Sequence, residues 1–209
     1  MNQLDLRPWQ AELGRPAELV QRDLESFAAL LTKWNATQNL VSRETLVQLW
    51  ARHVLDSLQL LSWIGRPALV LDLGSGGGLP GLPLAIALKE TGTSLHLVEP
   101  IGKKVAFLRT VARELSLDVV VHGCRTKDLP AFQPDIITSR ALADLSALLE
   151  MAAPMFSRET RALLHKGRDH RAEIDKAADA WVFDVLIHPS VTDASAAILE
   201  IANLSPRVR

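Results

Sequence analysis

The chain has 209 residues, of which 48% are hydrophobic and 22% are charged. These fractions are close to the average for globular proteins and exclude a disordered tail, a collagen-like fibre and a coiled coil. Lysine plus arginine (23) nearly balance aspartate plus glutamate (24), giving a formal net charge of −1. Any nucleic-acid partner must therefore be bound by a local basic patch rather than by bulk charge.

The N-terminus and the cysteine content predict a soluble, cytoplasmic protein. The first fifteen residues lack the basic stretch and apolar run of a secretory signal. The longest apolar runs are interrupted by Asp72, Lys89 or Glu99, so we expect no membrane span. A single cysteine, Cys124, excludes an internal disulfide. Six histidines without ligand spacing predict that no metal is bound.

The first third of the chain is predicted to be helical. Residues 1–15 show no sustained periodicity and are expected to form a loose arm. Hydrophobic residues from Val20 to Trp34 recur every three or four positions, which predicts an amphipathic helix. A polar connection and a second helix over 43–63 follow.

After residue 66, short apolar runs alternate with helical patterns, as is typical of a doubly wound α/β fold. The last two strands have little between them, which predicts a final hairpin and one antiparallel strand. We expect one domain, with a helical extension over 1–66 and an α/β core over 67–209. Seven strands are predicted at 68–73, 94–99, 118–122, 135–139, 161–165, 181–188 and 196–202, with helices at 82–89, 103–115, 142–151 and 169–180.

The most informative segment is LDLGSGGGLPG at 71–81, which joins the first predicted strand to its helix. A buried strand that runs into glycines lets a ligand approach the backbone at the carboxyl edge of the sheet. Either a dinucleotide or S-adenosylmethionine (SAM) can bind such a loop. The dinucleotide spacing Gly-x-Gly-x-x-Gly is present, but it starts at Gly76, two residues late.

Asp72 favours SAM over a dinucleotide. It lies in the strand just before Gly74, where a carboxylate repels a pyrophosphate and attracts the ammonium group of SAM. Glu99 ends the second strand, where it can accept both ribose hydroxyls of either cofactor. Thr126 and Lys127 follow the third strand, where the adenine ring is expected. An NAD(P)-dependent oxidoreductase stays the alternative, and a non-catalytic module that binds SAM and RNA is a third hypothesis.

Motifs on both sides of the glycine loop resemble those of one known family, over roughly residues 34–167. They are Trp34-Asn35, Asn39-Leu40-Val41-Ser42, Arg52-His53-Val54-Leu55-Asp56-Ser57, Gly102-Lys103-Lys104, Phe107-Leu108, Ser139-Arg140-Ala141 and Lys166-Gly167. In this order, they are similar to the bacterial guanine-N7 methyltransferases of 16S ribosomal RNA, the glucose-inhibited division protein B family. Val41 departs from the family, which more often has Thr there, and the C-terminus lacks the family's basic run.

This resemblance implies a Rossmann-like, SAM-dependent methyltransferase that modifies N7 of one guanine in 16S rRNA. The expected partner is that RNA within the small ribosomal subunit or its precursor, and the expected state is a monomer. Guanine N7 carries a lone pair and no proton, so the reaction needs positioning and electrostatics rather than a general base.

The residues that we expect at the site fall into three groups. Catalytic residues at the target base are Arg140, His53 and Asp56, of which the last two share a helix face. Cofactor-binding residues are Asp72, Gly74, Gly76, Gly78, Leu79, Glu99, Thr126, Lys127 and Arg140. RNA-binding residues are Lys103, Lys104, Lys166 and Arg168, of which Lys166 is expected to face the base or the RNA.

Overall fold

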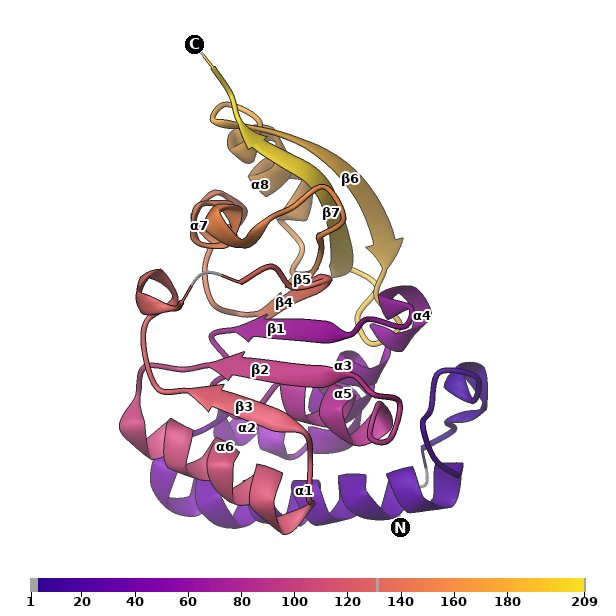
Figure 1. The fold of residues 1–209 in the computed structure, drawn as a ribbon. Coiled ribbons are helices and arrows are strands. Elements are labelled where there is room, and N and C mark those ends of the chain that lie inside the picture. The colour runs from indigo at the N-terminus through magenta and orange to yellow at the C-terminus, as the bar shows by residue number, and fades with distance from the viewer. Residues whose placement is uncertain (1–3, 131, 209) are drawn as a thin grey trace.

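The computed structural model describes residues 4–130 and 132–208, and a seven-stranded sheet runs through it (Figure 1). The strand order is β3-β2-β1-β4-β5-β7-β6. The strands from β1 to β5 pair in parallel, whereas β7 is antiparallel to both β5 and β6. The mostly parallel sheet and its final hairpin are therefore confirmed. The strands are β1 Leu69–Leu73, β2 Ser94–Val98, β3 Val119–His122, β4 Ile136–Arg140, β5 Arg161–Lys166, β6 Trp181–Pro189 and β7 Ala197–Pro206.

Helices cover both faces of the sheet (Figure 1). Adjacent strand residues point to opposite faces, so Val70 packs in the cluster with α1, α5 and α6, and Leu71 packs in the cluster with α7. Within the described residues, no helix combines the length and apolar character needed to cross a bilayer. The helices are α1 Ala17–Gln38, α2 Arg43–Leu46, α3 Asp56–Leu58, α4 Leu61–Ile64, α5 Gly81–Ala87, α6 Gly102–Glu114, α7 Leu145–Ala152 and α8 His170–Ala177, with short turns η1 Arg7–Trp9, η2 Trp50–Leu55, η3 Thr126–Asp128 and η4 Ala153–Met155.

The N-terminal third differs from the sequence prediction in two places. Residues 4–15 are no loose arm, because Leu6 and Trp9 are buried and the Trp9 indole N–H donates to Ser62 Oγ at 2.8 Å. Residues 1–3 of the expected arm lie outside the described residues. The single helix expected over 43–63 is broken into α2, η2, α3 and α4. The reason is that η2 is a wider π-helical turn, a feature found at functional sites.

The helical extension reaches the glycine loop. Helix α1 ends at Gln38 and is capped by Asn39, which adopts a left-handed conformation with φ 48°. The Asn35 side chain accepts a hydrogen bond from the Val41 N–H at 2.9 Å and so turns the chain back. A Cβ built on Gly77 would lie 3.3 Å from the Leu40 carbonyl oxygen. The residues after α1 therefore pack directly against the glycine loop.

Candidate active site

The glycine loop adopts a path that only glycine follows without strain. Gly74, Gly76 and Gly78 have φ values of 69°, 53° and 81°, in the left-handed region that L side chains rarely adopt. A Cβ at Gly78 would overlap the Leu82 side chain, and one at Gly74 would lie 2.6 Å from Leu142. The loop thus exposes backbone at the carboxyl edge of β1, as the sequence predicts for a nucleoside-type cofactor.

Asp72 is fully buried beneath this loop. Its Oδ1 accepts a hydrogen bond from Thr138 Oγ1 at 2.9 Å, whereas its Oδ2 has no partner among the described residues. Burial raises the pKa of Asp72 to about 6, although the hydroxyls of Ser75 and Thr138 and the backbone of Gly81 oppose this shift. A buried carboxylate oxygen without a partner is costly, and a cationic ligand at the loop offsets that cost. This part of the loop therefore fits SAM.

Glu99 fastens the glycine loop to the end of β2. Its Oε2 accepts the Gly76 N–H at 3.0 Å and its Oε1 accepts the Ile101 N–H at 2.9 Å. Each carboxylate oxygen has a further lone pair for a ribose hydroxyl. The sequence predicts that Glu99 binds the ribose, but it does not predict that Glu99 anchors the loop. The reason is that every residue type except proline has a backbone N–H, so these donors form no sequence motif.

Three further predicted cofactor residues lie around the loop and η3. The Leu79 side chain is buried in the hydrophobic core, so it leaves only its backbone for a ligand. Thr126 and Lys127 lie in η3 after β3 and line a cavity of about 350 Å³ with Met151 and Met155. No hydrogen bond or ion pair among the described residues joins this cavity to the glycine loop.

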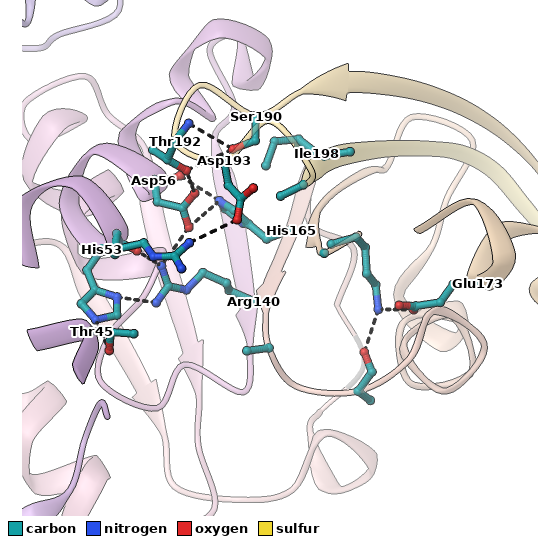
Figure 2. Close-up of a pocket in the computed structure, with 17 residues that line it drawn as sticks. Thr45, His53, Asp56, Arg140, His165, Glu173, Ser190, Thr192, Asp193 and Ile198 are labelled. Carbon is teal, nitrogen blue, oxygen red and sulfur yellow. Dashed lines mark hydrogen bonds and ion pairs between the residues drawn. The ribbon is translucent and has the colours of Figure 1, made fainter. Parts of the chain in front are cut away.

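A second cavity, of about 410 Å³, lies at the carboxyl ends of β4 and β5 and is named the cleft below (Figure 2). Arg140 ends β4 and lies at the centre of its hydrogen-bond network. Its Nη1 donates to Asp56 Oδ2 at 2.9 Å and to the Arg52 carbonyl at 2.8 Å, and its Nη2 contacts His53 Nδ1. The structure therefore brings the three predicted catalytic residues together.

His53 is held as a neutral imidazole. Arginine can only donate, so His53 Nδ1 accepts from Arg140, and Nε2 carries the proton that goes to Thr45 Oγ1 at 3.0 Å. Burial, followed by the Arg140 charge, lowers the pKa of His53 to about 4. At neutral pH, His53 is therefore uncharged, and its ring forms a hydrogen-bonded bridge between Arg140 and Thr45.

The side-chain oxygens of Asp56 are also engaged. Oδ1 accepts Thr192 Oγ1 at 2.6 Å and Gln59 Nε2 at 2.8 Å, and Oδ2 accepts Arg140. The His165 ring donates from Nε2 to the Asp56 carbonyl at 2.8 Å. Sequence reasoning missed Thr192 and His165, because they lie 136 and 109 residues from Asp56 and belong to no motif.

Arg140 keeps two N–H donors without a partner among the described residues, on Nε and on Nη2. Guanidinium donors of this kind bind the oxygens of carboxylate and phosphate groups. The cleft thus presents one charged, forked donor held by neutral and anionic neighbours.

The predicted RNA-binding lysines and arginine differ in accessibility. Lys103 and Arg168 are exposed and Lys104 is half-buried. Lys166 is only 7% exposed, and its ammonium donates to Glu173 Oε2 and to the Ala143 carbonyl, both at 2.7 Å. Lys166 also lines the cleft described above, so its contact with the base or the RNA stays a prediction, with the ammonium held by Glu173 and Ala143 in this conformation.

Comparisons with known proteins bear on this arrangement. The family described as rRNA small subunit methyltransferase G (GidB) matches residues 20–202. A protein of that name from Sinorhizobium medicae is 48% identical over 192 residues, which cover 89% of this chain and 90% of the relative. Another, from Bartonella quintana, is 45% identical over 185 residues, covering 87% and 86%.

Solved structures agree on the fold. A SAM-dependent methyltransferase from Aquifex aeolicus has a TM-score of 0.57 and 13% identity, covering 74% of this chain and 92% of that one. A mutant of MtNAS in complex with S-adenosylmethionine has a TM-score of 0.59 and 16% identity, covering 88% and 76%. The family match overturns the oxidoreductase alternative. This chain, whose glycine loop predicts SAM as the cofactor, belongs to the rRNA small subunit methyltransferase G family.

Proposed function

We propose that this chain transfers the methyl group of SAM to N7 of a guanine in 16S rRNA. The observation that carries the proposal is that the glycine loop and the Arg140 cleft lie at the same edge of the sheet, after neighbouring strands β1 and β4. A cofactor at the loop and a base at the cleft are then adjacent. The names of the family and of its relatives supply the substrate class.

On the cofactor side, the loop glycines and Leu79 offer backbone groups, and Glu99 offers its remaining lone pairs to the ribose. Asp72 has an electrostatic role in this proposal. Its Oδ2 lies beneath the start of α5, where a Cβ built on Gly81 would be 2.9 Å away. Thr126 and Lys127 flank the adenine. When bound, SAM supplies an electrophilic methyl group on a sulfonium ion.

On the base side, the chemistry requires positioning. Guanine N7 has no proton to lose, and the cleft matches this requirement, because His53 is neutral and Asp56 is fully hydrogen-bonded. A donor aimed at N7 would block its lone pair. Arg140 is therefore assigned to O6, a phosphate or the SAM carboxylate. The nearby Asp56 carboxylate stabilises the positive charge that moves onto the base.

The proposed substrate is the small subunit or its precursor, with the chain acting as a monomer. The basic groups Lys103, Lys104 and Arg168 form only a modest footprint, so the folded shape of the particle supplies the remaining specificity.

The test is tritiated methyl transfer to small subunits that lack the modification, followed by borohydride–aniline cleavage at N7-methylguanine. The expected result is one cleavage in 16S rRNA and weaker labelling of deproteinised RNA. Equal labelling of naked RNA and subunits would overturn the particle requirement. SAM binding without transfer to any RNA would support a non-catalytic binding module instead.

A further inference from the structure

The loop between β6 and β7, SVTDASA at 190–196, forms one wall of the cleft although it contains no recognised catalytic motif. Several hydrogen bonds hold it against the segment from η2 to α4, and two of them lie beside Thr192 in the sequence. Asp193 accepts from Arg52 Nη1 at 3.2 Å, and the Val191 N–H donates to Gln59 Oε1 at 2.9 Å. The loop is therefore held in place beside the catalytic residues.

Thr192 makes the shortest link between this loop and the Arg140 network, as Figure 2 shows. Its hydroxyl donates to Asp56 Oδ1 at 2.6 Å, on the side of the carboxylate opposite Arg140. Ser190 Oγ lies 3.0 Å from Thr192 Oγ1. Because a threonine hydroxyl has one proton and gives it to the carboxylate, Ser190 is the donor in this second contact. A chain of donors thus runs from the loop to Asp56.

We propose that Thr192 is a positioning residue for Arg140, acting through Asp56. The inference rests on the proposed methyl transfer. A carboxylate rotates about its terminal bond, and fixing Oδ1 sets the plane in which Oδ2 meets the Arg140 guanidinium. The guanidinium then presents its two remaining donors in one direction.

Asp56 Oδ1 has a second partner in Gln59, which lies three residues further along the same helical segment. Gln59 also accepts the Val191 N–H, so it supports the position of the loop that carries Thr192. Thr192 instead follows β6 and precedes β7, and β7 pairs with β5 in the sheet. Thr192 therefore joins Asp56 Oδ1 to the loop between β6 and β7, whereas Arg140 joins Oδ2 to the end of β4.

The first test is a spectroscopic signature that does not depend on activity. In ¹⁵N-labelled protein, the Nε–H resonance of Arg140 reports its surroundings, and Arg140→Lys assigns it. Thr192→Val removes the hydroxyl at constant shape and should shift and broaden this signal. Thr192→Ser should restore it. Ser195→Ala is the matched control, because the Ser195 hydroxyl donates to Asp193 within the loop, and it should leave the signal unmoved.

The second test is single-turnover methyl transfer to small subunits. Thr192→Val should slow the transfer step about tenfold, equivalent to about 1.4 kcal/mol, while Thr192→Ser stays within about twofold of the parent. In an Asp56→Ala background, Thr192→Val should cause no further loss, because coupled residues are not additive.

Each result decides the proposal. An unmoved Arg140 signal in Thr192→Val overturns it, and so does a full tenfold loss on top of Asp56→Ala. A moved signal with an unchanged rate overturns the catalytic part. If the parent protein labels no subunits, the proposed function fails, and the Arg140 signal still decides whether Thr192 positions that residue. Thr192→Ala serves the same comparison if Thr192→Val does not fold.

Discussion

The glycine loop and the cleft lie side by side, but they differ in how their charged side chains are paired. The loop side comes from residues 71–81 plus Glu99 and leaves one oxygen of Asp72 buried without a partner among the described residues. The cleft side joins η2, β4, β5 and the loop at 190–196, and pairs Arg140 with Asp56 and His53.

This difference predicts how each region affects the stability of the protein when no ligand is bound. An unpartnered carboxylate lowers stability until a cation neutralises it, whereas a paired network is already stable and holds a shape. Removing the charge of Asp72 should therefore lower ligand affinity and raise the stability of the ligand-free protein. Substitutions in the cleft should lower both rate and stability.

The largest effect is expected at Arg140, which tests most directly whether the cleft is the active site. Arg140→Ala should slow single-turnover methyl transfer at least about 100-fold. It removes the forked donor and leaves Asp56 without its cation, a loss of about 2–3 kcal/mol of stability. Arg22→Ala, on the exposed side of α1, is the control and should match the parent in both measurements. Retention of most activity in Arg140→Ala would show that the cleft is not the active site.

The second prediction concerns Asp72. Burial raises its pKa in the folded protein from the ordinary 3.8 to about 6, so the ligand-free protein should lose stability as pH rises from about 4 to about 6. Asp72→Asn should remove this loss and gain about 2 kcal/mol at pH 8, with no gain at pH 4, in urea unfolding. Asp72→Ala should abolish SAM binding in calorimetry. Equal SAM affinity in Asp72→Ala and the parent would contradict the assignment of the loop.

The third prediction separates backbone strain from crowding at the loop. Gly78 and Gly92 both have left-handed φ, at 81° and 85°, but a Cβ at Gly92 meets nothing within 4 Å, whereas one at Gly78 overlaps Leu82. Gly92→Ala should cost about 1 kcal/mol of unfolding free energy, and Gly78→Ala about 2–3 kcal/mol. Equal costs would show that the Leu82 contact relaxes freely.

The smallest effect is expected at Lys166, and it tests whether this residue belongs to the cleft or to the cofactor loop. Lys166 contacts Ala143 and Glu173, and Glu173 accepts the Leu145 N–H, so these groups set the segment after Arg140. Lys166→Ala should lower methylation about threefold, on the scale of a partly exposed hydrogen bond, with SAM affinity unchanged. Lys176→Ala removes an exposed lysine of α8, whose partner Asp144 is also exposed, and should have no effect. A loss of SAM affinity in Lys166→Ala would contradict this assignment.

Most of the fold could be predicted from local patterns in the sequence. The strands β1 to β5 lie within one or two residues of their predicted ranges, because a buried strand shows as a short apolar run. The break at η2 was missed, since a π-helical turn keeps the hydrophobic spacing of a helix at this length. Trp9 was missed for another reason, because its partner Ser62 lies 53 residues away.

The candidate site divides in the same way. The glycine loop and Glu99 are recognisable because their chemistry lies in one segment and one strand end. The cleft depends on contacts across 84 to 141 residues, as between Asp56 and Arg140 or between Arg52 and Asp193, and no spacing rule reports these. The burial of Lys166 was also unpredictable, because Glu173 reaches it only through the fold of α8.

The place of β7 between β5 and β6 has a consequence for the order in which the protein matures. As the chain leaves the ribosome, β1 to β5 can pair before residues 197–206 exist, so the loop side can form on a growing chain. The wall that carries Thr192 can dock only after β7 has emerged and entered the sheet. A chain cut before β7 would therefore lack the strand that anchors the Thr192 wall, and its cleft would be incomplete.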